Sequence, residues 1–450
     1  MAMRLKVVVI DDDPTGSQTV HSCPLLLRWD AASLRQGLAH ASPLLFVLAN
    51  TRALDPEAAR QRIQEICRAL RPALAAAVAE GLLDQWLVVS RGDSTLRGHF
   101  PLELEVIRQE LGPFGLTLLA PAFLPGGRTT VDGVHLLHGE PVHTTPFARD
   151  RLFGFRNSYL PAWVEEKTQG AVPAEQVGLL GLAELDAAAA PGGVELLCRR
   201  LEQLAAQPVV VVDAERPEQL QALGAALRLL LERGQRPLLQ AAASLINGLV
   251  PLPPQPLGPE GLAALRRCGV GLVLVGSHVP LADAQLQCLL AEPGCAAVEI
   301  AVPELAELLE AADPALPLRL LEQSLLQRLQ AALARGCTPV LFSSRGEVLA
   351  GDPLRRRRLG LELAALMARL AGCLAPQLGY LISKGGITSH TLLAEGLGAG
   401  AVELQGQLLP GLSLVLAGDL PVLTFPGNLG DGETLRQAWR LMEGSVGAAP

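Results

Sequence analysis

The chain has 450 residues, of which 49% are apolar and 18% charged, and it carries a formal net charge of −8 at pH 7. This length exceeds what one hydrophobic core usually serves, and the acidic balance excludes a basic field that would hold nucleic acid non-specifically. None of the eight cysteines forms a CxxC pair, which favours a reducing cytoplasm over a disulfide or zinc framework. A strand expected to begin at Leu5 leaves no room for a signal peptide, and no apolar run approaches the roughly 20 residues of a membrane span.

Two apolar runs near the N-terminus end in clusters of polar side chains. The run 5–10 predicts a buried strand, and Asp11, Asp12 and Asp13 follow it directly. The run 86–90 predicts a second strand, which is followed by Arg91, Gly92, Asp93, Ser94, Thr95 and Arg97. The carboxyl ends of parallel strands form the ligand crevice of an open sheet. The two clusters would therefore surround one pocket, suited to a small, anionic, polyhydroxylated substrate.

Strands and helices alternate through the first half of the chain, and this rhythm predicts a parallel sheet. Further strands are predicted over 44–49, 116–120 and 209–213, and helices over 60–79, 100–111 and 217–233. Residues 121–170 break the alternation and predict a functional loop or a β-excursion. The proline-rich stretch 249–262 predicts a semi-rigid linker between two domains.

A second α/β unit is predicted beyond the linker. Strands are expected over 271–276, 296–300, 338–343, 378–382, 400–406, 413–417 and 421–425, and helices over 280–292, 316–335 and 358–373. Three glycine-bearing turns, 276–279, 383–390 and 425–435, follow strands in this unit, where backbone N–H groups can cradle phosphate. The predicted architecture is therefore two α/β domains, 1–248 and 263–450, each a mostly parallel sheet flanked by helices.

Lys384 lies in the middle one of these turns, between a buried strand and two glycines. One ammonium and several N–H groups at such a turn can hold a phosphate chain, although an ordinary strand-to-helix turn would have the same sequence. No GxxxxGK[ST] motif occurs, which excludes a P-loop. No GxGxxG follows the first strand, which disfavours a dinucleotide-dependent dehydrogenase.

Taken in order, these motifs resemble those of the four-carbon acid sugar kinase family. The resemblance rests on DDDPTG at 11–16, NTR at 50–52, SRGDSTLRGH at 90–99, PAFLPGGRTTVDGVH at 121–135, and the turns GSHV, SKGGITS and PGNLGD. Proteins of this family phosphorylate tetronate-type acids such as threonate and erythronate with ATP. Two departures, Pro14 in place of a hydrophobic residue and Leu429 in place of Phe, leave the substrate open.

The resemblance implies an ATP-dependent kinase that acts on a hydroxyl of a threonate, erythronate or oxo-tetronate type acid. It places the acid against Asp12, Asp13, Arg52, Arg91, Gly92, Asp93, Ser94, Thr95 and Arg128. It places ATP against Ser277, Lys384, Gly385, Gly386, Ile387, Thr388, Gly427 and Asn428. Asp93 and Asp12 are both candidates for the catalytic base, and arginines such as Arg52 and Arg128 would pair the substrate carboxylate. Mg²⁺ is expected to bind with ATP and to have few protein ligands. The expected partners are the sugar acid and ATP, with a second copy of the chain as an open expectation.

Simpler alternatives remain for each feature. Asp11 to Asp13 would otherwise be a solvated turn, Asp93 to Thr95 a helix N-cap, and each arginine a surface ion pair. The histidines 135, 138 and 143 have no standard metal spacing and are expected to be structural. The run Arg355–Arg358 is expected to be a solvated helix face. For the whole chain, the alternatives are a non-catalytic sugar-acid-binding protein, a kinase of a different small hydroxy acid, or a sugar-acid lyase.

Overall fold

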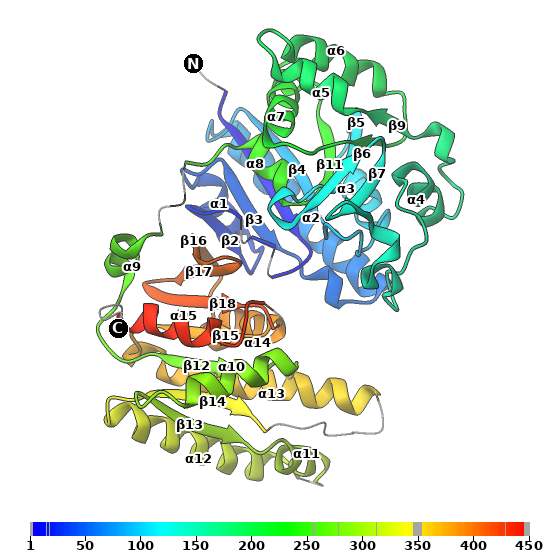
Figure 1. The fold of residues 1–450 in the computed structure, drawn as a ribbon. Coiled ribbons are helices and arrows are strands. Elements are labelled where there is room, and N and C mark those ends of the chain that lie inside the picture. Colours follow the sequence, from blue (N-terminus) through cyan, green and yellow to red (C-terminus); the bar gives the residue numbers. More distant parts are fainter. Residues whose placement is uncertain are drawn as a thin grey trace. The chain divides into compact units, whose positions relative to one another are not determined.

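The computed structural model describes residues 3–444, apart from positions 15, 18, 254, 256, 278, 312, 345–352 and 428. The chain divides into two compact units, Met1–Pro253 and Pro254–Pro450 (Figure 1). The division lies within the proline-rich stretch 249–262, the last part of which begins a short helix, α9 (Pro259–Leu265).

The first unit is built on a parallel sheet with the strand order β2-β3-β1-β4-β11-β5-β10-β9. Its strands are β1 (Leu5–Asp11), β2 (Cys23–Leu26), β3 (Leu44–Leu48), β4 (Gln85–Arg91), β5 (Leu116–Ala120), β9 (Gly178–Leu180), β10 (Val210–Val212) and β11 (Pro237–Ala241). Val7, Val8 and Val9 have no exposed surface, as expected for a central strand covered on both faces. The register pairs Asp11 with Leu48 on one side and with Arg91 on the other, so three strands end at the same level.

Helices cover this sheet and connect its strands (Figure 1). They are α1 (Ala31–Ala39), α2 (Pro56–Ala79), α3 (Leu102–Leu111), α4 (Leu160–Lys167), α5 (Leu182–Ala189), α6 (Val194–Leu204), α7 (Pro217–Glu232) and α8 (Ala243–Leu249). Helix α2 begins four residues earlier than its apolar period predicts. Asp55 caps it by accepting a hydrogen bond from the backbone N–H of Ala58, and Pro56 occupies the first position.

Residues 121–170 form a β-excursion, one of the two predicted outcomes. A three-stranded antiparallel sheet consists of β6 (Arg128–Val131), β7 (Val134–Leu137) and β8 (Glu140–Pro141). The two-residue turn Asp132-Gly133 has positive φ at both positions, 48° and 74°, as a tight hairpin with a primed turn requires.

The second unit has the strand order β13-β14-β12-β15-β18-β17-β16, parallel from β13 to β18 and antiparallel from there to β16. Its strands are β12 (Leu272–Val275), β13 (Cys295–Ile300), β14 (Thr338–Ser343), β15 (Leu381–Lys384), β16 (Ala401–Leu409), β17 (Leu412–Ala417) and β18 (Leu420–Phe425). Its further helices are α10 (Pro280–Leu290), α11 (Val302–Glu310), α12 (Ala315–Ala334), α13 (Pro353–Leu374), α14 (Gly386–Thr391) and α15 (Thr434–Glu443). The predicted class, α/β with mostly parallel sheets flanked by helices, is confirmed.

One described segment, Arg358–Gln377, is long and apolar enough to cross a membrane by length and composition alone, with a mean hydropathy of 1.4. The sequence interpretation did not foresee it. Half of this segment is buried inside the protein, and the core helix of a soluble protein would pass the same test.

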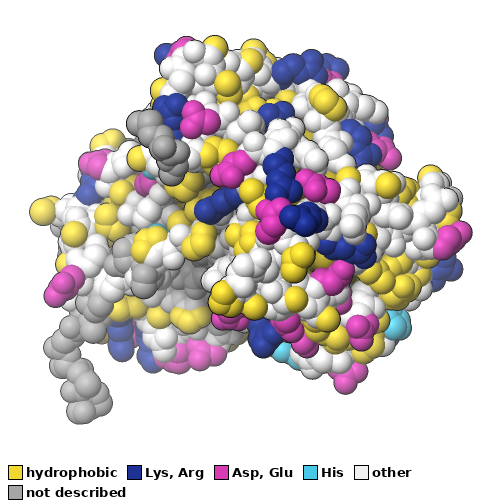
Figure 2. Space-filling model, turned by 90° about the horizontal axis from the view of Figure 1, so that it is seen from above, with side chains coloured by type: hydrophobic (Ala, Val, Ile, Leu, Met, Phe, Trp, Pro, Cys, Tyr) yellow, Lys and Arg dark blue, Asp and Glu magenta, His cyan; other side chains and the backbone are white. Residues whose placement is uncertain are grey.

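Charges of both signs are intermixed on the described residues of the face drawn in Figure 2, without a broad area of one sign. The described residues of this face show no extended basic stripe of the kind that tracks a nucleic-acid backbone.

Candidate active site

The predicted acid-binding residues gather at the carboxyl edge of the first sheet. Asp11 ends β1, Arg91 ends β4, and the 3₁₀ turn Thr51–Ala53 that carries Arg52 follows β3. These three strands are neighbours in the sheet, so the parallel register brings their polar ends together.

Two arginines compensate the run of aspartates. Arg52 donates two hydrogen bonds to Asp12, from Nη2 to Oδ1 at 2.5 Å and from Nε to Oδ2 at 3.1 Å. The Nη1 of Arg52 also lies 3.4 Å from Asp13 Oδ2. Arg91 Nη1 lies 3.2 Å from Asp12 Oδ1 and 3.4 Å from Asp11 Oδ1. Burial, with added repulsion from Asp12 and Asp13, raises the pKa of Asp11 to about 7 against the opposing pull of Arg91. The carboxylate of Asp12, only 2% exposed, is thus fully engaged by guanidinium groups.

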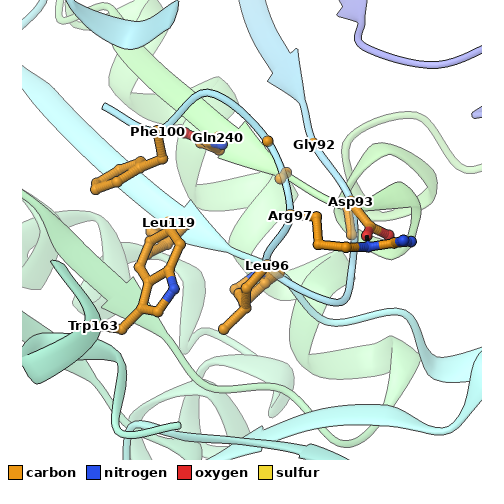
Figure 3. Close-up of a pocket in the computed structure, with 12 residues that line it drawn as sticks. Gly92, Asp93, Leu96, Arg97, Phe100, Leu119, Trp163 and Gln240 are labelled. Atoms are coloured by element: carbon orange, nitrogen blue, oxygen red, sulfur yellow. Dashed lines mark hydrogen bonds and ion pairs between the residues drawn. The ribbon is translucent and has the colours of Figure 1, made fainter. Parts of the chain in front are cut away.

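Asp93 has a different environment from Asp12. Its Oδ2 accepts a hydrogen bond from Arg97 Nε at 2.7 Å, and these two side chains lie together in Figure 3. The same oxygen also accepts a hydrogen bond from Thr95 Oγ1. Its Oδ1 accepts no hydrogen bond from any residue that the structure describes. Burial raises the pKa of Asp93, but the nearby Arg52 and Arg97 and the two hydrogen bonds outweigh burial, so its pKa lies below the ordinary value. Asp93 is therefore an ionised carboxylate with one oxygen available.

Arg128 carries a guanidinium without a carboxylate partner among the described residues. Its Nη1 donates to the carbonyl oxygen of Gly126 at 2.8 Å, and its Nε is buried without an acceptor. Burial lowers the pKa of Arg128, an effect that Asp93 opposes through its charge. Arg52 and Arg128, which the sequence groups as equivalent, therefore differ: one already holds two aspartates, and the other can still bind an anion.

Glu103 in the first turn of α3 joins the strand ends and was not singled out from the sequence. Its Oε1 accepts from Thr51 Oγ1 at 2.6 Å, and its Oε2 accepts from Ser90 Oγ at 2.9 Å. Burial, and then repulsion from Asp12, raise the pKa of Glu103 to about 7. His99 lies next to the same turn, with Nε2 at 3.0 Å from the carbonyl oxygen of Thr51. An acidic residue in a first helical turn is common, so no sequence signal marks this one.

The loop 92–99 is held from its other side by His135. This fully buried imidazole has Nε2 at 2.7 Å from the carbonyl oxygen of Ser94 and Nδ1 at 2.9 Å from Thr130 Oγ1. Burial lowers the pKa of His135 to about 4, so the ring is neutral at physiological pH. Gly92 lies against β11, because an added Cβ there would be 3.1 Å from Gln240 Nε2. His135 thus connects the β-excursion to the loop that carries Asp93.

The predicted nucleotide-binding turns come together at the carboxyl ends of β12, β15 and β18, which are neighbours in the second sheet. An added Cβ at Gly276 would clash with Thr388, and one at Gly427 would clash with Ser277. The three turns are therefore packed backbone against side chain. Gly386 and Ile387 begin α14, where Ile387 is 60% exposed, and the predicted position Asn428 lies outside the described residues.

Lys384 ends β15 at this meeting point and has no exposed surface. Its Nζ donates to the carbonyl oxygen of Pro426 at 3.1 Å and lies 3.8 Å from the centroid of the Phe425 ring. No carboxylate among the described residues pairs with it, and burial lowers its pKa to about 8. The backbone N–H of Gly385, at φ +124°, donates to the carbonyl oxygen of Phe425 at 2.8 Å. An ammonium that has no carboxylate partner among the described residues, and that lies where three glycine-bearing turns converge, is suited to a polyphosphate.

Comparisons with known proteins agree with this division. Residues 7–249 match a family model described as a sugar-binding N-terminal domain, and residues 272–435 match one described as a nucleotide-binding C-terminal domain. A D-threonate kinase of Bordetella bronchiseptica is 29% identical over 82% of this chain and 83% of its own length. A D-threonate kinase of Cupriavidus necator is 30% identical over 78% of each chain. A D-erythronate kinase of Heliobacterium modesticaldum is 30% identical over 32% of each chain.

Solved structures share the fold. One from Salmonella typhimurium superposes with a TM-score of 0.70 at 19% identity, over 97% of this chain and 99% of its own. One from Haemophilus influenzae superposes with a TM-score of 0.69 at 16% identity, over 97% of this chain and 100% of its own.

Proposed function

The chain belongs to the four-carbon acid sugar kinase family, and from this premise we propose that it transfers the γ-phosphoryl group of ATP to a hydroxyl of a four-carbon sugar acid. D-Threonate and D-erythronate, after which its relatives are named, are the first candidate substrates.

The observation that carries the proposal is Asp93, which keeps one oxygen without a hydrogen-bond partner among the described residues and acts electrostatically on the guanidinium of Arg128, itself without a carboxylate partner among those residues. Transfer to an alcohol needs a group that accepts the hydroxyl proton, and an ionised carboxylate with one available oxygen is suited to this. A sugar acid also needs a partner for its carboxylate, and the guanidinium of Arg128 could donate two parallel N–H hydrogen bonds to it. Asp12 is a weaker candidate for the base, because Arg52 and Arg91 already engage both of its oxygens.

The triphosphate would bind in the second unit. Lys384 would supply an ammonium there, and the turns at Ser277, Gly385–Thr388 and Gly427 would supply backbone N–H groups other than that of Gly385, which already donates to Phe425. Among the residues that the structure describes, no group of three His, Cys, Asp or Glu side chains could hold a metal ion. We expect a Mg²⁺ ion to bind with ATP, to take most of its ligands from the phosphates and water, and to neutralise phosphate charge there.

Two further expectations belong to the same proposal. All eight cysteines are thiols, as a reducing cytoplasm would maintain them. A homodimer stays an open expectation, and light scattering on the purified protein tests it.

The test is a screen of ADP release, coupled to NADH oxidation, with the D- and L-threonates, the D- and L-erythronates and their 2- and 3-oxo forms. We expect acid-dependent ADP release with at least one of them. Protein carrying Asp93→Asn, prepared in the same way, controls for contaminating kinases. Binding of an acid without ADP release would instead favour a non-catalytic sugar-acid-binding protein, and turnover of only other hydroxy acids would correct the substrate class.

A further inference from the structure

The loop between β4 and helix α3, which carries Asp93, is not fixed by its own contacts alone. Leu96 within it has a φ of 65°, a conformation that is unfavourable for a leucine. The hydrogen bonds that Thr95 and Arg97 donate to Asp93 stay within the loop. On one side the loop lines a pocket with about 310 Å³ of space that no atom fills, part of it open to solvent (Figure 3). The loop therefore depends on contacts from other elements for its position.

His135 supplies such a contact at the residue next to Asp93. Its Nε2 lies 2.7 Å from the carbonyl oxygen of Ser94, and its Nδ1 lies 2.9 Å from Thr130 Oγ1. A carbonyl oxygen can only accept, so Nε2 carries the proton of the neutral ring and Nδ1 accepts from the Thr130 hydroxyl. The imidazole has no exposed surface, so bulk water does not compete for either hydrogen bond. Each ring nitrogen thus has one defined partner, and the ring fixes the direction of the Ser94 carbonyl.

The ring itself belongs to the hairpin of β6 and β7, which begins with Arg128. His135 on β7 is directly opposite Thr130 on β6, so both side chains lie on the same face of the hairpin. Arg128 lies two residues before Thr130 on β6, and side chains two residues apart in a strand share a face. The hairpin is anchored just after β10, because the backbone N–H and carbonyl groups of Thr130 both pair with Ala214. One face of an anchored hairpin therefore carries both His135 and Arg128.

The charges of the site agree with this arrangement. Burial lowers the pKa of His135, and of the nearby charges Arg128 lowers it further while Asp93 opposes the change. Burial also lowers the pKa of Arg128, and Asp93 again opposes the change. The imidazole, the guanidinium and the carboxylate thus lie within electrostatic reach of one another.

We propose that His135 is a positioning residue for phosphoryl transfer: by binding the Ser94 carbonyl, it sets the distance between Asp93 and Arg128. The inference rests on the proposed function and deepens it. A sugar acid held at its carboxylate by Arg128 presents the reacting hydroxyl to Asp93 only if the loop lies at the correct distance from the hairpin. Misplacement of a reacting group by about 1 Å can cost about a hundredfold in rate, so loss of the hydrogen bond to Ser94 should lower kcat. The ring takes no proton from the substrate, because both of its nitrogens are already engaged.

The experiment compares three variants with the wild-type enzyme. His135→Met removes both ring nitrogens and keeps an apolar side chain of similar length, whereas His135→Gln keeps an amide N–H near the position of Nε2. His143→Met is the matched control, because His143 lies in the same β-excursion with its Nδ1 2.8 Å from Ser158 Oγ. ADP release with the best acid of the screen gives kcat and KM, and isothermal titration gives the Kd of the acid. Circular dichroism and thermal melting confirm folding, and His135→Asn, which is too short to reach Ser94, replaces the Met variant if that variant does not fold.

We expect His135→Met to lower kcat about tenfold to a hundredfold, while the Kd of the acid and the KM of ATP change less than about threefold. His135→Gln should recover kcat to within about threefold of wild type, and His143→Met should leave it unchanged. Equal loss of kcat in the Met and Gln variants would overturn the inference and assign His135 to packing alone, and so would a wild-type kcat in His135→Met. Loss of acid affinity without loss of kcat would also overturn it, since the hairpin rather than the loop would then have moved. A wild-type enzyme that turns over no acid would overturn the proposed function instead.

Discussion

Asp12 and Asp93 are identical side chains that the fold places in opposite circumstances. Asp12 has both oxygens bound by arginines and serves to hold Arg52 and Arg91 in place. Arg52 and Arg97 stabilise the negative charge of Asp93, but one of its oxygens has no hydrogen-bond partner among the described residues. The sequence left the base open between these two, and the geometry favours Asp93.

We expect Asp93→Asn to lower kcat by about two to four orders of magnitude and to change KM little, since a base acts only as the hydroxyl is attacked. Steady-state ADP release measures both constants. Asp132→Asn is the control, because Asp132 lies in the hairpin turn at φ 48°, a conformation that Asn also adopts readily. A near-normal kcat would return the role of base to Asp12, and loss of acid binding would make Asp93 a positioning residue.

At the scale of elements, one buried side chain connects β4, the 3₁₀ turn after β3 and helix α3. Glu103 on α3 accepts a hydrogen bond from the hydroxyl of Thr51 in the 3₁₀ turn and another from the hydroxyl of Ser90 in β4. The same turn carries Arg52, and β4 ends with Arg91. The neutral form of Glu103 is favoured by burial, so this connection depends on pH. Below the folded-state pKa of about 7 the carboxyl is protonated in the folded protein, whereas in the unfolded chain it loses that proton near its ordinary pKa of 4.5.

The stability associated with this proton is present below pH 4.5 and is lost as the pH rises through 7. We therefore expect Glu103→Gln, which stays neutral, to gain stability relative to wild type between pH 5 and pH 8, by up to about 3 kcal/mol. Urea unfolding followed by tryptophan fluorescence measures this, since three of the four tryptophans lie in the first unit. Glu105→Gln, an exposed position on the same helix, should show no such trend. A stability difference that is constant with pH would contradict the prediction.

Elements with a strong apolar run were predictable, and those without one were not. Strand β1 with its buried valines and the tight turn at Asp132-Gly133 have direct sequence signals. Strand β11 has no such signal, because its sequence PLLQA contains only two consecutive strongly apolar residues. It also lies in the sheet between β4 and β5, which are far from it in the sequence. The strand ends that carry Asp11 and Arg91 were therefore predictable, but the position of Gln240 in β11, where its amide packs against Gly92, was not.

The same limit applies to partnerships between side chains. Which aspartate meets which arginine depends on the register of neighbouring strands and on rotamers, and a shift by one residue would exchange the partners. Arg52 and Arg128 have the same chemistry in the sequence, and their different roles follow from which carboxylates lie within reach. The convergence of the glycine turns, by contrast, was already implied by parallel strand ends.

For the whole molecule, we expect the two units to bind different ligands. Lys384→Met, which keeps most of the volume but loses the charge, should weaken ATP binding about tenfold or more and leave binding of the acid within about twofold. Arg128→Ala should do the reverse, because it removes a charge-assisted partner of the acid. Isothermal titration with each ligand measures the four affinities. If either variant lost both ligands to the same degree, the division of labour between the units would be wrong.

The three lysines of the chain have one more property in common. Lys384 is fully buried, Lys6 is 5% exposed and donates to the carbonyl oxygens of His40 and Ser42, and Lys167 donates to the backbone of Phe153 and Gly154. Burial lowers the pKa of all three, to about 8 for Lys6 and Lys384. The cationic surface is thus made of guanidinium groups, whose charge persists far into the alkaline range. Amine-directed labels and cross-linkers should therefore modify the native protein slowly, and a nucleotide that shields Lys384 should slow its acylation further.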